Sequence, residues 1–156
     1  MLLDDATAYE AGRDLVASTF RVVEGLRIRA LGLNHYFHWK ISVDHSVDPL
    51  APEVRDALAR RSADPHVTRI QVKGDRTDDH KGAVGADIQP SVRVQQGFFC
   101  SVNDHYDLES YDRDEANERL QEILGTNWDT SGDVALEIAT NLVHLVTGSH
   151  DEIDSP

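Results

Sequence analysis

Residues 84–108 read VGADIQPSVRVQQGFFCSVNDHYDL, and this stretch decides the fold of the chain. Apolar and polar side chains alternate on both sides of a connection that contains Gly97, which is typical of strands with one dry and one wet face. Two such strands predict an antiparallel hairpin. One of its faces needs a cover of helices, and the other faces water or a partner. The apolar parity comprises Val84, Ala86, Ile88, Pro90, Val92 and Val94, then Phe98, Cys100, Val102, Tyr106 and Leu108.

The chain ahead of this hairpin changes its hydrophobic period three times. Residues 6–24 repeat apolar side chains at spacings of three and four, which predicts an amphipathic helix. Residues 26–43 alternate again and predict a long, central strand, with a bulge or bend where the phase slips near Gly32. A short helix over 53–61 and a short strand over 67–73 come next. The apolar stripe of the first helix comprises Leu15, Val16, Thr19, Phe20, Val22 and Val23.

Two helices are predicted after the hairpin. Asp112 followed by Glu115 is typical of a capping box at the start of the first helix, and Gly125 is expected to end it. Thr130 or Ser131 then caps the second helix. The buried side of that helix is expected to comprise Val134, Ala135, Ile138, Ala139, Leu142 and Leu145.

The order of elements, α-β-α-β-β-β-α-α, predicts an α+β fold. Its sheet has about four strands, is mostly antiparallel, and carries its helices on one face. We expect a single domain over residues 1–147, followed by an acidic, flexible tail over 148–156. The pattern leaves the strand order open, including whether the first strand lies beside the hairpin.

The composition narrows the choice of partner. The chain has 28 acidic and 15 basic residues and a formal net charge of −13, so it repels nucleic acid and anionic membranes. No apolar run reaches the length of a membrane span, and the N-terminus lacks an export signal. Cys100 is the single cysteine, which predicts a buried, inert thiol in a cytoplasmic protein.

The richest polar cluster lies in the second hairpin strand. Asn103, His105 and Asp107 project from one face, about 6–7 Å apart. With Ser101 and a cross-strand partner such as Arg93 they could form a hydrolytic or metal site. Side chains in a row on one strand diverge, however, whereas a metal needs converging ligands, so we expect no metal. A solvated sheet face, a recognition surface and a catalytic site remain the three interpretations.

Other polar groups are assigned ordinary roles. His35 shares parity with Phe37 and Trp39, which predicts a hydrogen-bonded core or rim histidine, whereas His38 is expected on the wet face. The segment 74–82 is predicted to be a mobile loop, and its Asp78-Asp79-His80 run could bind a cation only weakly. No phosphate-binding loop, dinucleotide fingerprint or metalloprotease signature occurs, and we expect no cofactor.

The order of elements from Leu26 to Val146, an antiparallel sheet followed by two C-terminal helices on an acidic chain, resembles the SecB type of export chaperone and its relatives that guard antitoxins. The resemblance implies polypeptide binding without catalysis. It rests on element order and on no residue motif. The N-terminal helix and the helix over 53–61 depart from that pattern.

The resulting functional hypothesis is a non-enzymatic protein-binding module, a chaperone or adaptor acting through sheet or groove contacts with a polypeptide, and forming a homo-oligomer. Phe99, Tyr36, Trp39 and Phe98 are its candidate apolar anchors, with core packing as the alternative for each. Phe99 falls on the wet parity beside Ser101, which favours a partner contact. Two other hypotheses remain: an assembly subunit of a phage particle or defence complex, and a small hydrolase using Asn103, His105 and Asp107.

Overall fold

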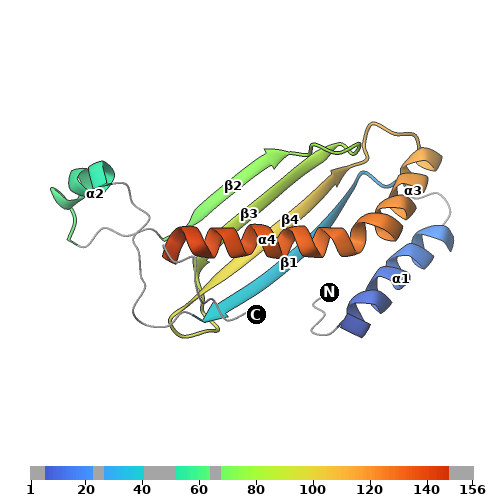
Figure 1. Ribbon diagram of the computed structural model, residues 1–156. Helices are drawn as coiled ribbons and strands as arrows, with labels where there is room; N and C mark the ends of the chain where they lie inside the picture. The colour runs from blue at the N-terminus through green and yellow to red at the C-terminus, as the bar shows by residue number, and fades with distance from the viewer. Residues whose placement is uncertain (1–5, 23–26, 41–51, 64–67, 148–156) are drawn as a thin grey trace.

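The computed structural model describes residues 6–22, 27–40, 52–63 and 68–147. It confirms the α+β class (Figure 1). The predicted tail over 148–156 and the glycine stop after the first helix lie outside the described residues. The elements are α1 (Ala6–Val22), β1 (Ala30–Lys40), α2 (Pro52–Ala59), β2 (Ile70–Asp75), β3 (Gly82–Pro90), β4 (Gly97–Asp107), α3 (Arg113–Glu122), the π-helical turn η1 (Ile123–Asn127) and α4 (Trp128–Thr147).

The four strands form one antiparallel sheet in the order β1-β4-β3-β2. The predicted hairpin is therefore present as β3 and β4, and it supplies the two central strands. β3 ends at Pro90, because the Ser91 hydroxyl accepts the backbone N–H groups of Arg93 and Val94 and so closes a turn. The prediction that Val92 and Val94 continue the strand is wrong, and the Val92 side chain is fully exposed.

β1 lies at an edge of the sheet, so the prediction of a central first strand is wrong. It pairs with β4 without interruption from Ala30↔Asp107 to Lys40↔Gly97, and no bulge occurs at Gly32. The phase slip in the sequence arises earlier. Ile28 is buried in the core before the strand begins, and the Arg29 carbonyl accepts the Leu108 N–H at 2.8 Å.

The C-terminal helices form one continuous, bent rod. Asp112 is the predicted N-cap, and its carboxylate accepts the Glu115 N–H at 2.9 Å. Gly125 does not end α3, because the chain passes through η1 directly into α4. A π-helical turn holds an extra residue and shifts the helical phase of the residues after it. It thereby lets Leu120 and Trp128 on either side of the turn both face the core.

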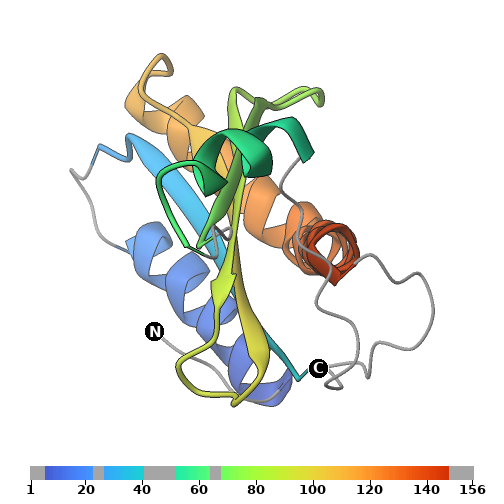
Figure 2. The same cartoon turned by 90° about the vertical axis from the view of Figure 1, so that its left-hand side faces the viewer.

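α4 covers one face of the sheet along most of its length (Figures 1 and 2). Small residues at Ala135 and Ala139 bring the helix close to the strands. This contact rotates the buried side away from the predicted one, so that Val134 and Leu145 are exposed. The core between α4 and the sheet comprises Trp39, Ala86, Ile88, Cys100, Val102, Ala135, Ala139, Leu142, Val143 and Val146.

α1 packs beside α3 and η1, where Tyr9, Val16 and Phe20 join a second core cluster. The Gln121 side-chain amide donates to the Ala17 carbonyl at 3.1 Å and ties the two helices together. Leu15, predicted on the buried stripe, is 60% exposed, because α1 contacts its neighbours through a narrower face than its apolar stripe.

The other face of the sheet carries no described helix, and α2 stands away from the strands (Figure 1). We call this surface the open face. It contains the odd-numbered residues of β2, β3 and β4 and the even-numbered residues of β1. In the described part of the chain, none of the helices combines the length and apolar character that crossing a membrane requires.

Candidate functional site

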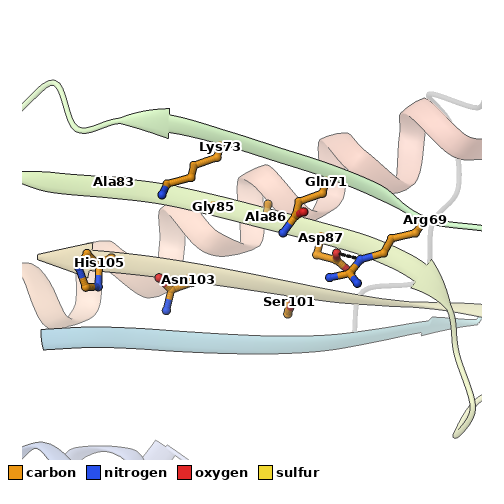
Figure 3. A pocket seen from close by; sticks show the side chains of 10 residues that line it. All are labelled: Arg69, Gln71, Lys73, Ala83, Gly85, Ala86, Asp87, Ser101, Asn103 and His105. Atoms are coloured by element: carbon orange, nitrogen blue, oxygen red, sulfur yellow. Dashed lines mark hydrogen bonds and ion pairs between the residues drawn. The ribbon is translucent and has the colours of Figure 1, made fainter.

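A groove of about 380 Å³ runs over β3 on the open face, between β2 and β4 (Figure 3). Side chains from these three strands line it, while α4 lies behind the sheet on the opposite face (Figure 3). The lining residues are Arg69, Gln71, Lys73, Ala83, Gly85, Ala86, Asp87, Ser101, Asn103 and His105.

The groove exists because β3 presents almost no side chain there. The register places Gly85 between Lys73 of β2 and Asn103 of β4, and it places Ala83 opposite His105. A Cβ atom added at Gly85 would meet only the Val72 carbonyl oxygen within 4 Å, at 3.8 Å. Space above Gly85 is therefore open, and a larger residue would fill the groove without disturbing the backbone.

The walls of the groove are polar and mostly unpaired. Lys73 and Gln71 lean from β2 over β3 (Figure 3). Within the described chain, no hydrogen bond or ion pair joins the side chain of Lys73, Gln71 or His105 to another residue. The Asn103 amide donates to the Asn34 side-chain oxygen at 2.6 Å, which fixes its orientation. These walls therefore offer donors that are ready to bind a ligand.

An ion pair between Arg69 and Asp87 closes one end of the groove (Figure 3). Asp87 points to the open face, as its parity predicts, but it is buried beneath the Arg69 side chain. Burial is the main cause that raises the pKa of the Cys100 thiol, on the neighbouring strand, to about 12, and the charge of Asp87 acts in the same direction. Cys100 is thus the buried, unreactive thiol that its parity predicts.

An aromatic cluster of Tyr36, His38 and Phe99 lies on the same face, toward the β3–β4 turn. The Tyr36 and Phe99 rings stack with centroids 6.0 Å apart, and the His38 ring lies 5.0 Å from Phe99. His38 Nδ1 hydrogen-bonds the Ser91 hydroxyl at 2.8 Å. Partial burial, followed by the charge of Arg93, lowers the His38 pKa, so the cluster is uncharged near neutral pH.

The four predicted anchors divide into two pairs. Tyr36 and Phe99 meet on the open face, where Tyr36 is 51% exposed. Trp39 is 1% exposed and lies in the core with Phe98 packed against that core, which is the alternative interpretation that the sequence allowed for both.

The row of Asn103, His105 and Asp107 does not converge on one point. Asn103 and His105 line the groove, whereas Asp107 lies outside it and accepts the Glu109 N–H at 2.9 Å. Arg93 lies in the β3–β4 turn, so its predicted role as a cross-strand partner is wrong. Ser101 does line the groove.

A buried ionic cluster at one end of the sheet escaped the sequence analysis. Arg76 forms ion pairs with Asp104 and Asp78, and its guanidinium lies 3.9 Å from the centre of the Tyr106 ring. The Tyr106 hydroxyl donates to Asp104 at 2.9 Å. Burial is the main cause that raises the Tyr106 pKa to about 12. Asp104 was the available signal, because it is an acid on the apolar parity of β4.

This cluster anchors residues 76–81. The loop is shorter than the predicted 74–82, because β2 extends to Asp75 and β3 begins at Gly82. Asp78 is engaged by Arg76, whose ion pair lowers the Asp78 pKa. His80 packs edge-on against the Tyr106 ring at 5.5 Å. No group of three metal-ligating side chains occurs in the part of the chain that the structure describes.

His35 is the hydrogen-bonded rim histidine that its parity predicts. Its Nε2 lies 3.0 Å from the Ser131 hydroxyl, and the Tyr9 ring covers it at 6.4 Å. Burial lowers the His35 pKa. Ser131 therefore serves as a buried partner inside α4, and the prediction that Thr130 or Ser131 caps that helix is wrong.

Comparison with known proteins adds no family to this description. The chain matches no protein-family model, and it has no significant match among curated proteins or solved structures.

Proposed function

We propose that this protein is a non-enzymatic module that binds an extended polypeptide segment across the open face of its sheet. The observation that carries the proposal is the pairing of an exposed aromatic cluster with an unpaired polar groove on one uncovered surface. The aromatic cluster offers an apolar anchor, and the groove offers hydrogen-bonding groups for peptide bonds and polar side chains.

The distance between the two features favours a chain-like ligand. Phe99 and Asn103 lie on the same strand and the same face, four residues apart, which corresponds to about 13 Å. A small molecule that filled the groove would not reach the aromatic cluster. An extended peptide of five or more residues spans both.

Charge also favours this face as the site of contact. The whole chain has 28 acids and 15 bases, but the open face, together with Arg69 just before β2, carries equal numbers of each among the described residues, so an approaching polypeptide meets little net charge there. The bases are Lys40, Arg69 and Lys73, and the acids are Asp75, Asp87 and Asp107.

The resemblance to SecB-type chaperones supports the same class of function through element order alone. We also propose self-association, because α4 exposes Val134 and Leu145 beside its buried side, and Leu145 is 57% exposed. Light scattering tests this proposal. A dimer or tetramer that dissociates in Leu145→Glu supports it, and a wild-type monomer refutes it.

The hydrolase hypothesis has weaker geometric support. Asn103 and His105 share the groove, but the third member of the proposed set, Asp107, lies outside it. His105→Ala should therefore leave any peptide intact in the presence of the protein, just as wild type does, and mass spectrometry of the incubated peptide would show this for both forms.

Suppression of the aggregation of a reduced or heat-unfolded client tests the proposed function directly. Wild type should suppress aggregation, and Tyr36→Ser combined with Phe99→Ser should weaken this effect several-fold. Leu15→Ser is the matched control, because it removes an exposed apolar side chain on α1. Equal activity of the double variant and the control would exclude the open face as the binding surface.

A further inference from the structure

We infer that the groove over Gly85 binds a carboxylate carried by the bound segment. The preferred ligand then has an acidic residue about four positions from a bulky apolar one. This inference rests on the proposed function, and it assigns a specificity to the part of the open face that the aromatic cluster does not reach.

The charge inside the groove is positive, although the molecule is acidic. Arg69 and Asp87 neutralise each other at one end, which leaves the Lys73 ammonium without a counter-ion among the described residues. The Lys73 side chain extends from β2 over β3 and ends between Ala83 and Gly85, so its three N–H donors lie above the bare floor (Figure 3). A carboxylate is the ligand group that an unpaired ammonium binds best.

The surrounding groups complete a site for an acidic side chain. Gln71 supplies an amide beside Lys73, and His105 lies across the groove on β4. Asn103 lies on β4 directly across Gly85 from Lys73, and Ser101 lies two residues away on the same strand, where its hydroxyl can bond the backbone of an extended ligand (Figure 3). The volume of about 380 Å³ accommodates a whole glutamate side chain together with part of its backbone.

The geometry of β4 sets the spacing of the two recognised residues. The Phe99 ring and the Asn103 wall are separated by four strand residues, about 13 Å. Alternate side chains of an extended ligand point to the same side, so positions i and i+4 face the sheet together. A Phe and a Glu in that relation would reach the aromatic cluster and the groove at once.

Fluorescence anisotropy with labelled nine-residue peptides in a Ser/Thr background tests the inference on the full chain. A peptide with Phe and Glu at i and i+4 should bind about five-fold more tightly than the Phe/Gln peptide. A Phe/Glu peptide at i and i+3 should lose this advantage, because its Glu points away from the sheet.

Two variants and two controls locate the effect. Lys73→Gln and Gly85→Leu should each abolish the preference for Glu over Gln. Lys81→Gln removes the same charge from the loop after β2, and Gly74→Leu adds the same bulk where nothing lies within 4 Å, so both should retain the preference. Circular dichroism confirms that each variant is folded.

The outcomes separate the inference from the proposed function. If Phe/Glu and Phe/Gln peptides bind equally well, the carboxylate site is refuted and polypeptide binding stands. If no peptide or unfolded client binds, the proposed function is refuted, and glutarate then probes the groove alone by NMR. Shifts of the Ala83 and Gly85 amides that disappear in Lys73→Gln support the site, and their absence overturns it.

Discussion

Arg76 and Asp104 form an ion pair in which both side chains are about nine-tenths buried. The Tyr106 ring and hydroxyl surround this pair and replace the water that the charges lose. A buried charge that loses its partner is costly, whereas a pair replaced as a whole is often tolerated. The cluster therefore holds the β2–β3 hairpin in place, and it does so only while both charges are present.

Asp104→Asn should lower the free energy of unfolding by about 3 kcal/mol, because it leaves the Arg76 guanidinium without its main buried counter-charge. Arg76→Met combined with Asp104→Leu should recover a large part of that loss. Urea unfolding of wild type and the two variants measures both effects. A double variant less stable than Asp104→Asn would show that the cost does not come from an unpaired buried charge.

His35 should make the stability of the fold depend on pH. Burial lowers its folded pKa below the usual 6.5, so the unfolded chain binds the proton more readily. The neutral ring contributes its full stability above about pH 6.5, and that contribution is lost as the pH falls toward the folded pKa. The free energy of unfolding of His35→Gln should decline less between pH 7 and pH 5, and an unchanged decline would contradict this assignment.

At the scale of elements, the π-helical turn η1 joins α3 to α4 where the sequence predicts a stop at Gly125. A glycine that ends a helix adopts a left-handed conformation that alanine resists. Gly125 has no such conformation, and a Cβ added there would meet nothing within 4 Å. The two interpretations of this residue therefore predict opposite effects of one methyl group.

Gly125→Ala should raise the free energy of unfolding by about 0.5–1 kcal/mol, because alanine loses less backbone entropy in a helix than glycine does. Gly82→Ala is the contrasting variant. Gly82 has a φ of 144°, and an added Cβ would collide with the His105 carbonyl, so this substitution should destabilise. Thermal unfolding measures both, and a destabilised Gly125→Ala protein would favour a helix end at that position.

The elements show which parts of the fold a periodic pattern reveals. The alternation in 84–108 places β3 and β4 correctly, because the buried and exposed faces of a strand are visible in the sequence of that strand alone. The edge position of β1 depends on which strand pairs with β4, and no local period encodes that choice. Likewise, the rotation of α4 comes from close contact at Ala135 and Ala139, which a count of apolar residues does not weigh.

The sequence likewise predicts part of the candidate site, namely the face on which its β4 residues lie. Parity alone places Asn103, His105 and Phe99 on the wet face of β4, where the structure has them. The groove, however, requires Gly85 on β3 to lie between Lys73 and Asn103, two residues far apart in the sequence. It depends on the register of three strands, and that register becomes visible only in the folded molecule.

At the scale of the whole molecule, the net negative charge of the chain favours a basic ligand, whereas the groove favours an acidic group on that ligand. The net charge of −13 attracts a basic polypeptide over distances comparable to the Debye length, about 10 Å at 0.1 M salt. The groove then selects a carboxylate by direct contact with Lys73, at a separation far below the Debye length, so salt screens this contact less than it screens the long-range attraction. The best ligand is therefore basic overall and acidic at one position.

Adding two lysines to each end of the Phe/Glu peptide should accelerate its association at low salt, because long-range attraction steers the encounter. Raising the salt from 0.05 M to 0.5 M should remove most of this acceleration but retain part of the preference for Glu over Gln. Stopped-flow fluorescence separates the two, since steering changes the association rate and the groove contact changes the dissociation rate. If salt removed the faster association and the preference for Glu to the same extent, the preference would come only from the long-range electrostatic field of the protein, without a contact between Lys73 and the ligand.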